Sequence, residues 1–196
     1  PVTTAGRLIG HWVHQGSGDW ALGAANGDRG APEDIAAVGE RVYTATPGGI
    51  WLRSSLIEPA WFTGLPGVRL IAVDADETAV VALDAAGSRV VVWAPDGRAI
   101  GNWPVAAGGR AVAASDLTVG GGRVYIADTG RNRVLVRSIA GDDLGEWRVH
   151  DGPQRLDMTP DGDIVVLGRG GWGLRYTADG ALRAAAPGGD PEVIAA

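Results

Sequence analysis

Short apolar segments recur along the chain at intervals of about 40 residues. Four of them align on Tyr43, Val81, Tyr125 and Val165, which lie 38, 44 and 40 residues apart. Each segment is rich in β-branched, aromatic or other apolar residues, so each predicts a short β-strand. The aligned segments are Glu40–Ala45, Thr78–Leu83, Gly122–Ala127 and Gly162–Leu167.

Three further strands accompany each of these segments, one before it and two after it. The preceding strands are predicted at Asp34–Val38, Leu70–Asp74, Asp116–Val119 and Leu156–Thr159. The third strands are predicted at Ile50–Arg53, Arg89–Trp93, Arg133–Arg137 and Gly173–Tyr176. The fourth strands are predicted at Pro59–Phe62, Arg98–Trp103, Asp143–Trp147 and Ala181–Ala184. Four short strands in each repeat of about 40 residues are the pattern of a β-propeller blade.

The turn residues support this interpretation. Asp-Gly pairs at Asp96-Gly97, Asp161-Gly162 and Asp179-Gly180 stand where a tight hairpin needs a positive φ. No stretch of about ten residues shows helical spacing free of Gly, so we predict an all-β fold, a β-propeller of four-stranded antiparallel blades. We expect one domain over 1–196: a partial blade at 1–30, blades at about 31–67, 68–109, 110–152 and 153–189, and a partial strand at 190–196.

The two ends of the chain resemble parts of a fifth blade. Gly6–Trp12 matches Gly97–Trp103, a fourth strand, and Asp190–Ala195 resembles Ala31–Ala36, the entry to a first strand. Two interpretations follow: the ends meet and close the ring with an incomplete blade, or the chain is a piece of a longer propeller. We favour the second because exposed edge strands promote unwanted pairing and natural chains avoid them.

Composition narrows the possible partners. All 17 basic residues are Arg, against 23 acidic residues, and the net charge of −6 comes with no basic stretch, which disfavours nucleic acid as a partner. The chain has no Cys, which excludes disulfides and thiolate metal sites. No apolar stretch approaches the roughly 20 residues that span a bilayer, so we expect no direct membrane insertion.

One segment carries a recognisable motif. From Val124 to Val136, a strand, the turn Asp128-Thr129-Gly130-Arg131-Asn132-Arg133 and a second strand resemble the NHL repeat, a propeller repeat. The resemblance implies a domain that binds ligands or proteins, as NHL-like propellers do in sensor kinases, cell-surface proteins and RNA-binding regulators. Related propellers are lactonases and lyases. We therefore expect an extracytoplasmic or cell-surface location and attachment to a larger polypeptide or assembly.

Candidate binding residues follow from where propeller sites lie, at the face formed by the inter-blade connections and by the loops between second and third strands. These positions hold charged, imidazole or indole side chains. They are His14, Asp84, Asp128, Arg131, His150, Asp151, Arg169 and Trp172. Trp20 joins them because, like Trp172, it breaks the repeat pattern and stands near Gly.

Each candidate also has a structural interpretation. The Asp128 carboxylate is expected to accept backbone N–H bonds in an Asx-type turn, and Arg133 to pair across blades. The carboxylates of Asp74, Asp76 and Glu77 could hold a hard cation but are expected to form a solvated turn. The tryptophans at fourth-strand positions are expected to pack between blades. They are Trp12, Trp103, Trp147 and, by weaker analogy, Trp61.

Three functions remain open. The first is a non-catalytic module that presents one face to a protein, peptide or glycan. The second is a metal-dependent enzyme of the lactonase or lyase type, which the small number of His and the lack of a repeated set of inward carboxylates disfavour. The third is a structural subunit or spacer of a cell-surface assembly. No catalytic residue, metal ligand or cofactor is assigned, and calcium is the single ion left to test.

Overall fold

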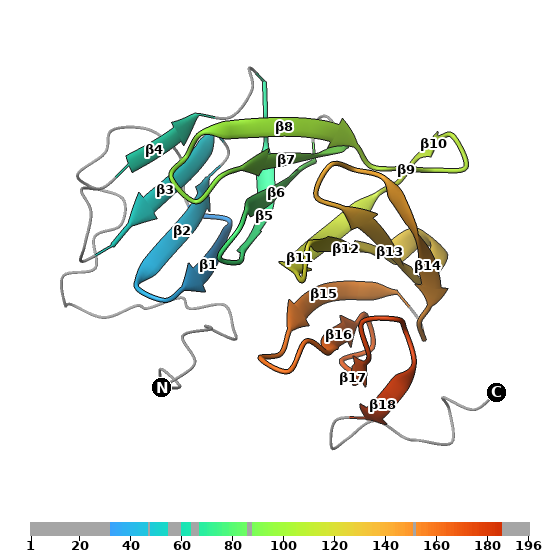
Figure 1. Ribbon diagram of the computed structural model, residues 1–196. Coiled ribbons are helices and arrows are strands. Elements are labelled where there is room, and N and C mark those ends of the chain that lie inside the picture. The colour runs from blue at the N-terminus through green and yellow to red at the C-terminus, as the bar shows by residue number, and fades with distance from the viewer. Residues whose placement is uncertain are drawn as a thin grey trace.

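The computed structural model describes residues 32–46, 48–54, 60–63, 67–85, 88–150 and 152–185, with the backbone alone described for 60–63 and 185. Over these residues the chain forms four four-stranded antiparallel sheets arranged around a common centre (Figure 1). The predicted all-β propeller fold is confirmed. The helical content of this part of the chain is one 3-10 turn, η1 (Thr129–Arg131), and no helix there is long and apolar enough to span a membrane.

Each blade uses its four strands in chain order. Blade 1 contains β1 (Asp34–Val38), β2 (Arg41–Thr46), β3 (Gly49–Arg53) and β4 (Ala60–Thr63). Blade 2 contains β5 (Leu70–Ala75), β6 (Val80–Asp84), β7 (Arg89–Trp93) and β8 (Ala99–Pro104). Blade 3 contains β11 (Ala114–Gly120), β12 (Arg123–Asp128), β13 (Arg133–Ser138) and β14 (Asp143–Arg148). Blade 4 contains β15 (Pro153–Met158), β16 (Ile164–Gly168), β17 (Gly173–Tyr176) and β18 (Leu182–Ala185).

The apolar core lies between the blades. Because side chains alternate across a strand, β6 turns Val80 and Ala82 toward blade 1 and Val81 and Leu83 toward blade 3. The same alternation places Tyr125 between blades 3 and 4. Each large apolar side chain buried in this way contributes about 1.5–3 kcal/mol. The blades are therefore held together mainly by the faces that their second and third strands present to each other.

Fourth-strand tryptophans pack between blades 2 and 3 and between blades 3 and 4, as predicted. The Trp103 indole in β8 donates to the Ile139 carbonyl of blade 3 at 3.1 Å and packs on Gly141. Trp147 in β14 packs toward blade 4: it lies on Gly180, and its ring centroid is 6.4 Å from that of Tyr176, but its buried indole N–H has no hydrogen-bond partner among the described residues. The Trp61 side chain and all of Trp12 lie outside the described residues.

The predicted Asp-Gly turns are confirmed. Gly97, Gly162 and Gly180 have φ of +90°, +83° and +87°, and each donates its N–H to the carbonyl three residues earlier at 2.9 Å. Where such a turn joins a third strand to a fourth, the register of the two strands shifts just beyond it. This is the geometry of a type I turn followed by a left-handed residue, which favours Gly.

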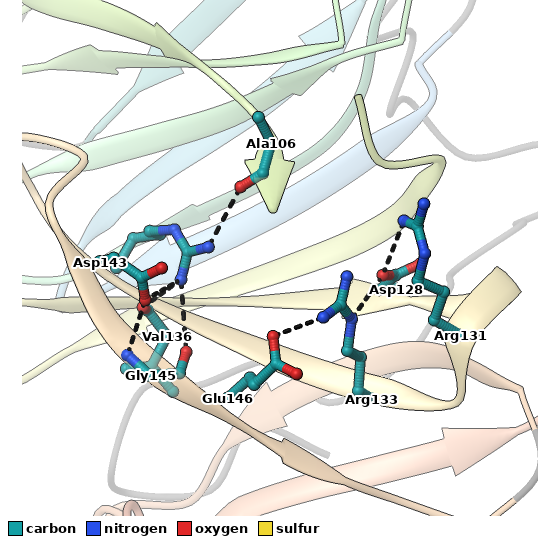
Figure 2. Close-up of polar contacts among 9 residues, drawn as sticks. Ala106, Asp128, Arg131, Arg133, Val136, Asp143, Gly145 and Glu146 are labelled. Atoms are coloured by element: carbon teal, nitrogen blue, oxygen red, sulfur yellow. Dashed lines mark hydrogen bonds and ion pairs between the residues drawn. The ribbon is translucent and has the colours of Figure 1, made fainter. Parts of the chain in front are cut away.

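One element was not predicted. The connection from blade 2 to blade 3 contains a small hairpin, β9 (Ala106–Ala107) and β10 (Arg110–Ala111), so the expected boundary between residues 109 and 110 falls inside it. The buried guanidinium of Arg137 donates to the Ala106 carbonyl at 3.1 Å and holds this hairpin against blade 3 (Figure 2).

The innermost strands carry a set of carboxylates that links consecutive blades, contrary to our expectation. Asp34 of β1 accepts the Val73 N–H, and Asp116 of β11 accepts the Leu156 N–H. Asp74 of β5 accepts the Val119 N–H at 2.8 Å. The prediction that no repeated carboxylates point inward was therefore wrong. Asp74 precedes its aligned second-strand residue, Val81, by two residues fewer than Asp34 and Asp116 precede Tyr43 and Tyr125. This difference in spacing hid the pattern in the sequence.

Candidate functional site

Three loops meet where blade 3 joins blade 4, on the face that carries the inter-blade connections. They are the turn from Thr129 to Asn132, the connection from Val149 to Gly152, and the turn from Arg169 to Trp172. The Asn132 carbonyl accepts the Val149 N–H at 3.0 Å, and its side-chain Oδ1 accepts the Gly152 N–H at 2.9 Å. The Gly152 carbonyl in turn accepts the Arg169 N–H at 3.0 Å. Two backbone hydrogen bonds and one side-chain hydrogen bond therefore fix the three loops to one another.

Two residues with positive φ make this bracing possible. Asn132 has φ +52°, in the left-handed region that Asn tolerates better than most residues. Gly152 has φ +46°, and a Cβ there would lie 3.4 Å from Arg169 Cβ and 3.5 Å from Thr129 Cγ2. Gly152 is thus a point of close approach between the turns of the two blades.

Asp128 and its neighbours form a chain of ion pairs at the start of the Thr129–Asn132 turn (Figure 2). Asp128 Oδ2 accepts Arg133 Nε at 2.8 Å, and the same guanidinium reaches Glu146 of β14. The Asp128 carboxylate accepts no capping bond from the turn, so the predicted Asx-type turn is wrong. Arg133 pairs within its own blade and not across blades. The buried carboxylate is satisfied by the guanidinium that faces it in the β12–β13 ladder.

Asp84 occupies the equivalent place in blade 2. Its Oδ2 accepts Arg89 Nε at 2.8 Å and its Oδ1 accepts the Arg69 N–H at 2.8 Å. Asp84 and Asp128 are 0% and 1% exposed. Both carboxylates therefore brace the turns that display other side chains, and Asp84 does so in blade 2.

Trp172 and His150 lie against each other at this junction. Their ring centroids are 5.6 Å apart, in an edge-to-face arrangement. The Trp172 indole lies over the chain at Gly168, where a Cβ would come within 1.9 Å of the ring, so only Gly fits there. Burial raises the pKa of the neighbouring Tyr176 phenol, and a hydrogen bond from the His150 backbone opposes that shift. Its neighbours Gly168 and Tyr176 therefore hold this half-buried aromatic pair in place.

Three exposed arginines lie on the braced loops or on β15, the strand that follows Gly152. Arg131 is 43% exposed and lies 3.5 Å from the Asp128 oxygen that Arg133 already occupies. Arg155, which the sequence analysis did not select, is 49% exposed and lies 3.9 Å from Asp116. Arg169 is exposed, and its guanidinium makes no ion pair within the residues described. We call Arg131, His150, Arg155, Arg169 and Trp172 the junction surface.

The two carboxylates that pair with guanidinium groups of the junction surface, those of Asp128 and Asp116, are buried. Asp128 is buried beneath Arg131 and Arg133. Burial raises the pKa of Asp116 to about 8, and the nearby Asp34 carboxylate adds to the shift, while the Leu156 N–H bond and Arg155 oppose it. Burial therefore disfavours the ionised form of the Asp116 carboxyl. The exposed groups of the junction surface carry an excess of positive charge on a chain whose net charge is −6.

The acidic cluster suggested for a hard cation does not assemble. Asp76 Oδ1 accepts the Thr78 and Ala79 N–H groups in a turn, Glu77 pairs with Arg41 of blade 1, and Asp74 is buried in β5. The expected solvated turn therefore holds for Asp76 and Glu77 but was wrong for Asp74. Across the described ranges, no three His, Asp or Glu side chains are placed to hold a metal ion. His14, Trp20 and Asp151 lie outside those ranges, so their assignment stays a prediction.

Solved structures similar to this fold are β-propeller proteins. Virginiamycin B lyase from Staphylococcus aureus matches with a TM-score of 0.63 and 15% identity, over 81% of this chain and 56% of the lyase. A streptogramin B lyase structure matches with a TM-score of 0.61 and 12% identity, over 78% of this chain and 53% of its own. BBS1N, in complex with ARL6DN, matches with a TM-score of 0.57 and 14% identity, over 74% of this chain and 49% of its own.

These similarities show the fold alone, because the identities are low. The chain spans about half the length of the propellers that it matches. No family model matches the sequence, and a search of curated proteins finds no relative. The propellers that it resembles include enzymes and a protein-binding domain, so the function must be argued from the junction surface itself.

Proposed function

We propose that this chain is a non-catalytic binding module and that the junction surface contacts a protein or peptide partner. The observation that carries the proposal is the pairing of Trp172 with His150 on a rigid platform whose loops also carry the exposed Arg131 and Arg169. Trp and Arg dominate the energetics of protein interfaces because they offer a large contact area and several hydrogen-bond donors.

The rigidity of the platform supports this proposal. The hydrogen bonds around Asn132 and Gly152 fix the loops before a partner arrives, so little conformational entropy is lost on binding. The similar propeller BBS1N, solved in a complex with another protein, provides a precedent for partner binding on this fold. The motif from Asp128 to Arg133 supports membership of the NHL-like propellers, which would place the module in a larger, extracytoplasmic protein.

Selection from a random 12-residue peptide display library tests the proposal. We expect the full chain to enrich peptides that bind neither Trp172→Ala nor His150→Ala. Leu144→Ala is the matched control, because Leu144 is 51% exposed on the outer strand of blade 3. Circular dichroism establishes that each variant is folded. Failure to enrich any peptide, or equal binding by Trp172→Ala and Leu144→Ala, would contradict the proposal.

A further inference from the structure

The junction surface differs in charge from the rest of the chain. Arg131, Arg155 and Arg169 come from three different elements, β15 and the two turns that flank Gly152. Each is exposed to solvent. Among the described residues, the carboxylates that pair with Arg131 and Arg155, those of Asp128 and Asp116, are buried, and the exposed Glu146 carboxylate is bonded to Arg133. The guanidinium groups therefore keep most of their five N–H donors available to an incoming acceptor.

Resting on the proposed function, we infer that the partner presents an acidic peptide segment, with carboxylates that bind Arg131 and Arg169 beside an apolar residue that packs on Trp172. Guanidinium groups bind carboxylates in a planar, two-bond geometry that strengthens where water is excluded. The aromatic pair of Trp172 and His150 supplies the apolar contact that excludes it.

The overall charge of the protein favours a short acidic segment over a polyanion. The net charge of −6 repels a nucleic acid at long range. At physiological salt, charges interact over roughly 8 Å. A few carboxylates placed next to three guanidinium groups are therefore attracted by those groups more than they are repelled by the net charge of the whole chain. A peptide that mixes acidic and apolar residues thus fits the surface better than a phosphate backbone.

Fluorescence anisotropy with three labelled probes tests this inference on the full chain. The probes are a 12-residue peptide of alternating Leu and Glu, the same peptide with Gln for Glu, and oligothymidylate of 12 nucleotides. We expect the Glu peptide to bind at least tenfold more tightly than the Gln peptide, and this preference to shrink as NaCl is raised. The double variant Arg131→Gln/Arg169→Gln should remove the preference. Arg98→Gln should keep it, since Arg98 is exposed on the opposite face, in the β7–β8 turn.

The outcomes separate the inference from the proposed function. Equal affinity for the Glu and Gln peptides, with binding still lost in Trp172→Ala, would overturn the acidic segment and leave the proposed function standing. Tighter binding of oligothymidylate, or displacement of the Glu peptide by millimolar inorganic phosphate, would overturn it in favour of phosphate recognition. If neither peptide binds and the library selection also fails, both are overturned.

Discussion

Gly180 offers the sharpest test of how the blades are joined. A Cβ on Gly180 would lie 2.5 Å from Trp147 Cγ and 2.7 Å from its Cβ and Cδ2. Carbon atoms in contact prefer about 3.5–4.0 Å, so the indole must move by roughly 1 Å. That movement is opposed by Tyr125, whose ring lies 5.7 Å from that of Trp147, and by Tyr176 on the other side. Gly180→Ala should therefore loosen the interface between blades 3 and 4.

Gly162 is a matched control for this substitution. It has φ +83°, against +87° for Gly180, in a turn with the same Thr-x-Asp-Gly pattern, and nothing lies within 4 Å of its Cβ position. Left-handed strain of about 1–2 kcal/mol applies to both variants. Overpacking of about 1–3 kcal/mol applies to Gly180→Ala alone. In a chain of this length the difference corresponds to a melting temperature roughly 2–12 °C lower for Gly180→Ala than for Gly162→Ala.

Urea unfolding followed by far-ultraviolet circular dichroism measures both free energies of unfolding. The double variant Trp147→Leu/Gly180→Ala completes the cycle, and against Trp147→Leu alone the Gly180 substitution should cost no more than Gly162→Ala does. Equal losses for Gly162→Ala and Gly180→Ala in the presence of Trp147 would refute the reasoning. They would mean that Trp147 does not couple the blades.

Three further predictions follow from the buried polar groups. The folded-state pKa of Asp116 is raised to about 8, so the protonated Asp116 stabilises the fold at acid pH. This contribution to the free energy of unfolding should be lost as the pH rises from about 4 through 8. Asp116→Asn should make the free energy of unfolding less dependent on pH over this range. Asn132→Ala should lower the free energy of unfolding by about 1–2 kcal/mol and speed hydrogen exchange at the Gly152 N–H, because the bond to the Asn132 side chain is lost. Asn132→Asp should keep that bond. Unchanged exchange in the Ala variant would contradict the bracing role of Asn132. Asp128→Asn breaks a buried ion pair and should lower the free energy of chemical unfolding by about 3–5 kcal/mol. Asp179→Asn breaks an exposed pair with Arg123 and should lower it by about 0–1 kcal/mol. Similar losses for the two variants would show that burial does not strengthen the Asp128 pair.

Most strands could be predicted from the sequence because their periodicity is set by burial on both faces. The segments around Tyr43 and Tyr125 form strands within one or two residues of their expected bounds. The β9–β10 hairpin escaped prediction since its strands have two residues each and their side chains are no more than half-buried. Its position depends on Arg137, whose contact with Ala106 spans 31 residues.

The candidate site was only partly accessible from the sequence. Propeller topology brings the turn before Asn132 and the connection after Val149 to one face, and the sequence predicts that much. The sequence does not show whether a carboxylate on this face is exposed or buried, because that depends on the residue that pairs with it. The bond from Arg133 keeps the Asp128 carboxylate buried. The contact between His150 and Trp172 depends on loop conformations that no repeat pattern encodes, and the exposure of Arg155 depends on which blade face its position in β15 meets.

The location of the binding surface is the central claim, and amide chemical-shift mapping tests it most directly. The isotope-labelled full chain would be titrated with a peptide recovered by the library selection. We predict that the shifts gather on residues 129–132, 149–152 and 168–172. Shifts gathered instead on the turns at the opposite face, 94–98, 139–142 and 177–181, would contradict the account.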